Sequence, residues 1–314
     1  MVNVLDRPLR AMILAAAGNS AVRRFVSVHG MRLGAARFVA GETAGDFLAV
    51  ARRVNHDGFA VAAGILGEGT RDEAGARDAT EEYSALLQRF RVERLDANVA
   101  LKVTHLGLDL SPELALQNVR RVAQRAADCD NTMRLDMEQS CYVDATLSIY
   151  RTLRTEGFAN VGFVLQSYLH RSVSDLEALL PLGSNVRIVK GAYLEPKGVA
   201  FQEKREVDEN YARLVERSLV DGAYTAIATH DGALIERAIA FAEQRGIPKS
   251  GRFEFQMLYG VASPLAKKLV ARGYRVRLAV PYGDFWFPYL MRRLAERPAN
   301  VAFLLKNLLA RGGA

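Results

Sequence analysis

The stretch VRLAVPYGDFWFPYLMRRLAE, from Val276 to Glu296, contains a strand pattern followed by a helix pattern. Its first five residues alternate apolar side chains with Arg277 and Ala279, which predicts a β-strand. The turn-forming sequence PYG at 281–283 predicts that the strand ends there. The residues that follow predict a helix. The whole stretch is therefore typical of one strand–helix unit of an α/β fold.

The predicted helix has one polar and one apolar face. At about 100° per residue, the polar face carries Tyr289, Arg292, Arg293 and Glu296. One interpretation is a solvent-exposed face on which Glu296 pairs with both arginines. The other is a binding site, in which two guanidinium groups steadied by a carboxylate hold a small carboxylate ligand. The helix pattern alone leaves both interpretations open.

The composition is that of a globular protein with a basic balance. The 314 residues suffice for one large α/β domain or two small ones. Cys129 and Cys141 are the only cysteines and offer neither a metal-binding spacing nor a disulfide framework, so a cytoplasmic location is expected. The net charge of +7 favours anionic partners. Because the arginines are spread along the chain without a basic tail, no nucleic-acid partner is predicted.

The N-terminal residues faintly resemble a signal peptide, since an apolar run at 11–18 follows Arg7 and Arg10. The run is short and Arg23 and Arg24 follow it, which favours an amphipathic helix. No stretch of the sequence is long and apolar enough to span a bilayer. We expect a helical arm at 1–56 and a catalytic barrel at 57–314.

Eight apolar, β-rich runs alternate with amphipathic helical segments over most of the chain. The runs lie at 59–66, 99–103, 133–137, 161–166, 186–189, 224–228, 253–258 and 276–280. Such runs are typical of parallel strands buried on both faces, so apolar strand interiors are expected. Eight units over about 250 residues predict a (βα)8 TIM barrel. An open doubly wound sheet is the alternative, but neither GxGxxG nor a P-loop follows any strand.

Polar side chains gather at the predicted C-terminal ends of these strands, where TIM barrels place their chemistry. The strand-end segments are 67–68, 102–105, 136–138, 166–168, 190–193, 229–231 and 256–259. Four of their side chains could ligate a metal, namely His105, Asp136, Glu138 and His230. The many cations at the same rim argue against a metal, and none is predicted. A Schiff-base lysine at Lys102 or Lys190, in an aldolase-type TIM barrel, is the alternative function.

In chain order, these strand ends resemble the proline dehydrogenase family. Its members are FAD-dependent barrels, found alone or as a domain of bifunctional proline utilisation A proteins. The matching segments are LGE (66–68), LKVTHLG (101–107), RLDMEQ (134–139), VLQSYL (164–169), RIVKGAYLE (187–195), ATHD (228–231), EFQMLYG (254–260) and YLMRRLAE (289–296). The resemblance extends from about residue 42 to residue 300.

The resemblance implies a distorted barrel whose last helix lies over the C-terminal ends of the strands. It implies oxidation of L-proline, or of a close cyclic amino acid such as 4-hydroxyproline, to a Δ1-pyrroline-5-carboxylate-type imine. A hydride passes to N5 of FAD and the electrons then pass to a quinone, as the first step of proline catabolism. Contact with a quinone pool would be peripheral, on the inner face of a membrane.

The resemblance also implies residue roles. The substrate side comprises Arg292, Arg293 and Lys102 for the carboxylate, Glu68 and Glu296 to orient the arginines, Asp136 beside Lys102, and Tyr193, Leu258 and Tyr289 as pocket walls. The FAD side comprises Gln166, Arg187, Lys190, Gly191, Ala192, Thr229 and His230, with Arg187 near N5. One position departs from the family, which commonly has RxYxPxG at the eighth strand. Here RLAVPYG places Ala279 at the tyrosine position, which implies more room beside the substrate ring.

Overall fold

The computed structural model describes residues 35–67, 69–261 and 263–296, without the side chains of Arg292 and of 294–296. The chain divides into two compact units. One comprises Ala51–Gly64 and Glu68–Ala279, and the other comprises Met1–Val50, Ile65–Gly67 and Val280–Ala314. The predicted boundary between an arm at 1–56 and a barrel at 57–314 stays a prediction, because residues 1–34 lie outside the described part.

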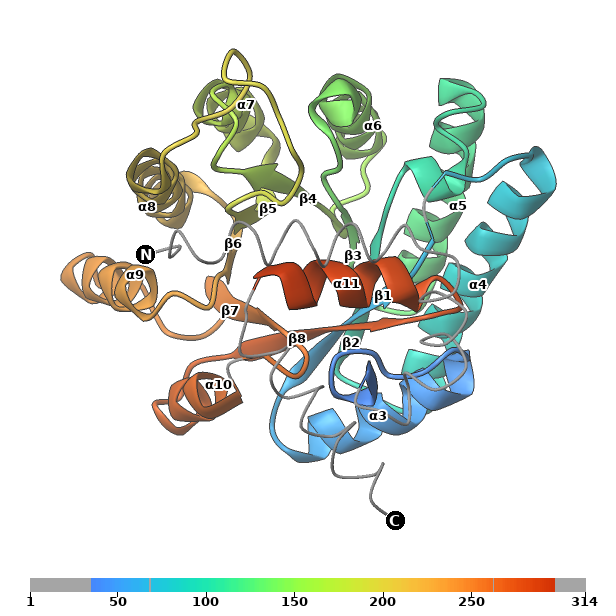
Figure 1. Ribbon diagram of the computed structural model, residues 1–314, viewed down its shortest axis with the longest axis horizontal. Coiled ribbons are helices and arrows are strands. Elements are labelled where there is room, and N and C mark those ends of the chain that lie inside the picture. The colour runs from blue at the N-terminus through green and yellow to red at the C-terminus, as the bar shows by residue number, and fades with distance from the viewer. Residues whose placement is uncertain (1–34, 68, 262, 297–314) are drawn as a thin grey trace. The chain divides into compact units, whose positions relative to one another are not determined.

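Eight parallel strands form a closed barrel in which neighbours along the chain are neighbours in the sheet (Figure 1). The strands are β1 (Ala60–Ile65), β2 (Ala97–Leu101), β3 (Met133–Leu135), β4 (Val161–Gln166), β5 (Asn185–Val189), β6 (Tyr224–Ala228), β7 (Phe253–Leu258) and β8 (Val276–Tyr282). The predicted (βα)8 barrel is confirmed. The prediction that the last strand ends before Pro281 is wrong, since β8 continues through Tyr282.

Helices follow the strands and surround them in the larger unit (Figure 1). The α-helices are α3 (Ala44–His56), α4 (Glu73–Val92), α5 (Pro112–Asp128), α6 (Val143–Thr155), α7 (Ser172–Leu179), α8 (Lys204–Asp221), α9 (Gly232–Gln244), α10 (Ser263–Ala271) and α11 (Trp286–Glu296). Short 3-10 turns are η1 (Ala35–Arg37), η2 (Thr104–Leu106), η3 (Ser140–Tyr142) and η4 (Leu180–Leu182). Among the described residues, no helix combines the length and hydrophobicity needed to cross a bilayer.

Local sequence explains where several of these helices begin. Helix α5 starts at Pro112, because the Ser111 hydroxyl accepts from the backbone N–H of Glu113 and Leu114 and Pro112 occupies the first turn. Asp72 caps α4 and Asp231 caps α9 in the same manner. These caps satisfy backbone donors that the first helical turn leaves without intrahelical partners.

Several side chains that face the inside of the barrel are polar or charged, so the expectation of apolar strand interiors fails for β3, β5, β7 and β8. Arg134, Glu254, Gln256 and Arg277 are all buried, with exposed fractions between 2% and 7%. Arg187 on β5 contacts Gln256 on β7, and side chains of strands that are not neighbours can meet only inside the barrel. Alternate residues of a strand point to opposite faces, so apolar residues such as Phe253 and Phe255 lie on the outer face, whereas Val164 and Ala226, the register partners of Arg187, face the inside.

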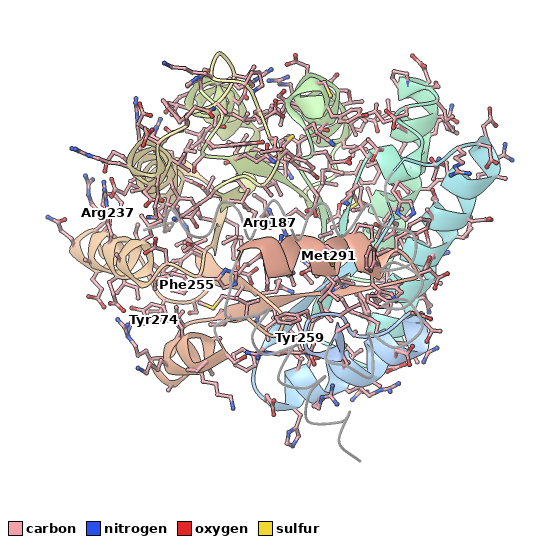
Figure 2. All side chains as sticks on the ribbon, viewed as in Figure 1. Arg187, Arg237, Phe255, Tyr259, Tyr274 and Met291 are labelled. Carbon is pink, nitrogen blue, oxygen red and sulfur yellow. The ribbon has the colours of Figure 1, made fainter. Side chains whose placement is uncertain are left out.

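Strand β7 shows this division within one sequence, FEFQML. Phe253, Phe255 and Met257 are buried on one face, and the rings of both phenylalanines pack near Tyr274 with centroids 6.0 and 5.5 Å away. Figure 2 labels Phe255 and Tyr274. Glu254 and Gln256 occupy the alternate positions and face the polar interior. The outer face therefore supplies the apolar burial, and the inner face is free to carry chemistry.

The smaller unit gathers three segments that are far apart in the sequence. The backbone N–H of Ala40 donates to Pro281 over 2.9 Å, and that of Leu66 donates to Tyr282 over 2.7 Å. The Tyr282 ring packs 5.1 Å from the Phe47 ring and is fully buried. On α11, Leu290 and Met291 are buried as the apolar face predicts. The position of α11 over the strand ends stays a prediction.

Candidate active site

Lys102 and Asp136 stand at the C-terminal ends of adjacent strands. The backbone N–H of Asp136 donates to the carbonyl of Leu101 over 2.8 Å, which continues the β2–β3 ladder by one residue beyond Leu135. Both side chains are half-buried. The structure thus brings together the first lysine and the first aspartate of the predicted site on neighbouring strands.

The Arg187 side chain extends from β5 into the inside of the barrel, where it contacts Asp136 at the end of β3 and Gln256 on β7. One terminal nitrogen, Nη2, pairs with Oδ1 of Asp136, and the other, Nη1, donates to Oε1 of Gln256 over 3.5 Å. The Arg187 side chain is 12% exposed. Its Nε is buried and has no hydrogen-bond partner among the described residues. The Nε–H of this guanidinium is therefore available to a ligand.

The buried carboxylate of Glu254, on β7, accepts hydrogen bonds from several donors inside the barrel. Oε1 of Glu254 accepts from the Gln256 amide over 2.6 Å and from Nε of Arg277 over 2.8 Å, and Oε2 accepts from Nε of Arg275 over 3.1 Å. Burial acts to raise the pKa of Glu254, but Arg277 and the other donors bring that pKa below its ordinary value. Glu254 is therefore ionised at neutral pH.

Arg134 shares this interior and is held by neutral acceptors. It donates to the carbonyls of Phe163 and Asn185 and, over 2.7 Å, to the amide oxygen of Asn185. Burial, followed by the nearby charge of Arg187, lowers the pKa of Arg134 to about 10. Gly162 leaves space for this guanidinium, since an added Cβ would lie 2.8 Å from Nη1. The interior thus concentrates positive charge near Arg187.

Lys190 belongs to a cluster of two lysines and two aspartates at the rim. Its ammonium lies 2.6 Å from Asp208 and 3.2 Å from Asp231, and Lys204 contacts the same two carboxylates. Burial acts to raise the pKa of Asp208, but hydrogen bonds from Lys190 and Lys204 bring it below its ordinary value. Asp208 and Lys204 lie on α8, and we did not predict either residue. Neither follows a strand, so the strand-end argument could not find them.

Gln166, at the end of β4, has an unsatisfied acceptor. Its Nε2 donates to the carbonyl of Met137 over 3.3 Å, while its Oε1 has no partner among the described residues, although the side chain is only 2% exposed. Buried polar atoms are rarely left without a partner. Val189, beside Gln166 in the β4–β5 ladder, is two residues beyond Arg187 on the same strand face. The open acceptor and the open donor of Arg187 therefore lie on neighbouring strands.

The other predicted cofactor residues follow β5 and β6. Gly191 has a φ of +114°, and an added Cβ would overlap the ring of Tyr168, so the position requires glycine. Ala192, next to it, is exposed. The Thr229 hydroxyl accepts from the backbone N–H of Asp231 over 3.1 Å. Nε2 of His230 accepts from the backbone N–H of Leu258 over 2.9 Å, so a neutral His230 carries its proton on Nδ1.

Leu258 and Ala279 are register partners on β7 and β8, and both are half-buried. Leu258 lies two residues beyond Gln256 and Ala279 two residues beyond Arg277. Both therefore face the inside of the barrel, nearer the C-terminal ends of the strands. Tyr193 is half-buried in the loop after β5.

Several predicted substrate contacts lie in the smaller unit or outside the described residues. Cζ of Arg293 lies 5.2 Å from the centroid of the Tyr289 ring, which places the two residues together on one face of α11. Glu68 lies outside the described residues, as do the side chains of Arg292 and Glu296.

The four side chains considered as metal ligands have other neighbours, and the ring of His105 lies edge-on to the ring of Tyr83 with centroids 6.1 Å apart. Asp136 pairs with Arg187, Glu138 accepts from the backbone N–H and the hydroxyl of Thr104, and His230 accepts from Leu258. Across the part of the chain that the structure describes, no three His, Cys, Asp or Glu residues lie close enough to hold a metal ion.

Comparison with known proteins identifies the family. The proline dehydrogenase family model matches residues 47–306. Proline dehydrogenase 1 of Bacillus subtilis subsp. natto is 42% identical over 301 residues, covering 96% of this chain and 99% of that protein. Proline dehydrogenase of Deinococcus radiodurans is 39% identical over 310 residues, covering 98% of this chain and 99% of that protein.

A solved structure of a proline utilization A protein is also similar to this chain. Proline utilization A (PutA) from Bdellovibrio bacteriovorus, inactivated by N-propargylglycine, matches with a TM-score of 0.77 and 28% identity over 83% of this chain. The chain spans about a third of that longer protein, since 32% of it is covered. These matches do not favour an aldolase-type barrel. The family model over residues 47–306 and the two relatives that match nearly the whole chain show that the chain belongs to the proline dehydrogenase family.

Proposed function

We propose that this protein is an FAD-dependent dehydrogenase that oxidises L-proline to the corresponding cyclic imine. The observation that carries the proposal is Arg187, a guanidinium held inside the barrel by Asp136 and Gln256 with its Nε–H still open. A fixed positive charge in a buried site favours a ligand that gains negative charge during the reaction. The relatives named proline dehydrogenase support the choice of substrate.

The open polar atoms fit a flavin. Gln166 presents a carbonyl-type acceptor and Arg187 presents an N–H donor, and the isoalloxazine edge offers a matching N–H donor and several acceptors. Gly191, Ala192, Thr229 and the Lys190 cluster would hold the remainder of the cofactor, and His230 would contribute through its Nδ1–H. A bound FAD supplies the hydride acceptor, which these side chains do not provide.

The substrate side requires positioning and no acid–base group of its own. Arg292, Arg293 and Lys102 would bind the carboxylate of the amino acid, with Glu68 and Glu296 orienting the two arginines. Charge-assisted bonds in a bidentate geometry fix the orientation of a carboxylate as well as binding it. With the carboxylate fixed, the ring carbon beside nitrogen is held in one position, which lowers the entropic part of the barrier.

Ala279 gives this chain a wider pocket than the family tyrosine would. Its neighbour in the ladder is Leu258, and both side chains are half-buried. Tyr282 packs against Phe47, and the Tyr259 hydroxyl accepts a long bond of 3.5 Å from Arg53. Each of these tyrosines therefore already has a packing or hydrogen-bonding neighbour. We propose that the protein also accepts 4-hydroxyproline or a bulkier cyclic amino acid.

We propose a quinone as the electron acceptor, reached by peripheral contact with an anionic membrane. The basic balance of the chain supports electrostatic attraction to such a surface. The proposed carriers, Arg7, Arg10, Arg23, Arg24 and the segment 301–309, lie outside the described residues. Binding to anionic vesicles should decrease steeply with added salt. Binding that is unchanged in high salt would contradict an electrostatic contact.

One experiment tests the main proposal. The protein is expressed with ample riboflavin, purified, and examined for visible flavin absorbance. Addition of proline without oxygen should bleach that absorbance, and an artificial dye acceptor should restore it with continuous turnover. A folded protein that is colourless and unable to take up added FAD would refute the proposal.

A further inference from the structure

Glu254 fixes the orientation of the Gln256 side chain. The two residues are two positions apart on β7, and the Gln256 amide nitrogen donates to Oε1 of Glu254 over 2.6 Å. A side-chain amide can otherwise flip and exchange its donor and acceptor. A carboxylate accepts only, so Glu254 holds the NH2 group of Gln256 on its own side. The amide oxygen of Gln256 must then point the other way, toward Arg187.

The orientation of Glu254 is itself fixed by arginines from the last strand region. Arg277 donates to Oε1 over 2.8 Å and also to the carbonyl of Val61 over 2.8 Å, which ties the carboxylate to β1. Arg275 donates to Oε2 and pairs with Asp96 near the lower rim over 2.6 Å. A chain of polar contacts therefore extends from Asp96, just before β2, through Glu254 and Gln256 to Arg187.

Arg187 is held from two sides as a result. Asp136 binds Nη2 and Gln256 binds Nη1, so the plane of the guanidinium is set by one acceptor that follows β3 and one on β7. A buried network of ionised groups is costly to desolvate, and an apolar core of the same volume often gives equal or greater stability. Stability alone therefore does not explain why this interior is charged, whereas control of one guanidinium does.

We infer that Glu254 and Gln256 form a positioning relay, which orients Arg187 toward the ring of the bound flavin and thereby sets the flavin's reduction potential. Neither residue touches the flavin or the substrate in this inference. It rests on the proposed function, because it takes Arg187 to lie beside the flavin. A fixed cation near the ring stabilises the negative charge that reduction adds, so a loosened Arg187 makes the flavin harder to reduce.

The test measures the two-electron reduction potential of the bound flavin by equilibration with a reference dye. Gln256→Leu removes the acceptor for Nη1 while keeping similar bulk, and Glu254→Gln keeps the shape but no longer dictates the amide orientation. We expect both to lower the potential, with Gln256→Leu shifting the reduction equilibrium by tenfold or more, which is about 30 mV for two electrons. Should Gln256→Leu not fold, Gln256→Met, which is unbranched and of similar length, takes its place.

Asn98→Leu is the matched control. Asn98 is a buried polar residue of the barrel, 7% exposed, which donates over 3.1 Å to the hydroxyl of Thr132, just before the neighbouring strand β3, and is far from Glu254 and Gln256 in the sequence. The Asn98→Leu variant should lower the melting temperature, as the relay variants should, and leave the reduction potential of the bound flavin unchanged. Folded relay variants with a wild-type potential would overturn the relay alone. An unmodified protein without bound flavin would instead overturn the proposed function, and the relay's role with it.

Discussion

Asp136, which directly follows β3, and Arg187 on β5 form an ion pair although β4 lies between the two strands. The pair therefore crosses the inside of the barrel, where neither charge is fully solvated. The exposed fractions of the two side chains are 28% for Asp136 and 12% for Arg187. Such a contact positions a charge for chemistry more firmly than a surface pair can, because solvent does not compete for it freely.

Asp136→Asn should reduce kcat/KM for proline while leaving the protein folded. Asparagine keeps the shape and one acceptor but removes the negative charge beside Arg187. A charge-assisted hydrogen bond is worth about 1.5–3 kcal/mol, which corresponds to roughly a ten- to hundredfold loss. Steady-state rates with a dye acceptor measure it. Asp144→Asn is the control, since Asp144 also pairs with an arginine but its side chain is 82% exposed; equal losses in the two variants would contradict a special role for Asp136.

Arg292→Ala and Arg293→Ala should each weaken binding of the substrate carboxylate. We expect a loss of about 1.5–3 kcal/mol in transition-state binding, or roughly ten- to a hundredfold in kcat/KM, with flavin still bound. Arg272→Ala removes an arginine that pairs with Glu236 at the surface of the larger unit, over 2.6 Å, and serves as the control. If both α11 variants had the kinetics of the unmodified protein, the polar face of this helix would be a solvent-exposed surface and not a binding site.

Ala279→Tyr should sharpen the substrate preference. A ring placed beside Leu258 fills the proposed space. The added packing should stabilise the transition state with proline by about 1–3 kcal/mol, so kcat/KM for proline should rise, while kcat/KM for 4-hydroxyproline or a bulkier ring should fall. Ala279→Phe separates the contribution of the ring from that of the hydroxyl. Competing-substrate rates give the ratio directly. Damage to both substrates would mean that the space is already filled.

His105 should make stability depend on pH below neutrality. Burial, and then the charge of Lys102, lowers the pKa of His105 from 6.5 to about 4. The unfolded chain binds a proton below 6.5 but the folded protein only below about 4, so stability is present above 6.5 and is lost as pH falls toward 4. The loss from pH 7.5 to pH 5 should be about 1–2 kcal/mol.

Urea midpoints at the two pH values measure this loss. His105→Gln should remove that part of the pH dependence. His56→Gln, at a histidine whose side chain is 90% exposed, should leave it unchanged. An identical pH dependence in His105→Gln and the unmodified protein would refute the assignment.

The order and type of the elements could be read from the sequence, because apolar runs separated by amphipathic helices specify alternating strands and helices. Strands β4, β6 and β7 have the predicted bounds. The polar interior was missed because a run such as FEFQML was treated as apolar on both faces. The run alternates apolar and polar residues, and this alternation would have revealed the polar interior. Because helices cover the outer face of the barrel, the alternate polar residues Glu254 and Gln256 can only point inward.

The site was predictable only where chemistry follows a strand end. Lys102, Asp136 and Gln166 meet that rule, and the structure gathers them on adjacent strands. Arg187 lies two residues before the end of β5, and its place was implied by the family resemblance alone. Asp208 reaches Lys190 from α8, a contact between residues whose spacing has no local pattern. Pairings of that kind depend on tertiary packing.

The smaller unit joins the beginning of the described chain to its end. Nε1 of Trp286 donates to Glu42 over 2.8 Å, across a separation of 244 positions. At a synthesis rate of about 5–20 residues per second, Glu42 leaves the ribosome roughly 12–50 s before Trp286 does. During that interval Phe38 and Phe47, both fully buried in the finished protein, lack their later partners such as Tyr282. Burial of these two rings therefore has to wait for the last part of the described chain to be synthesised.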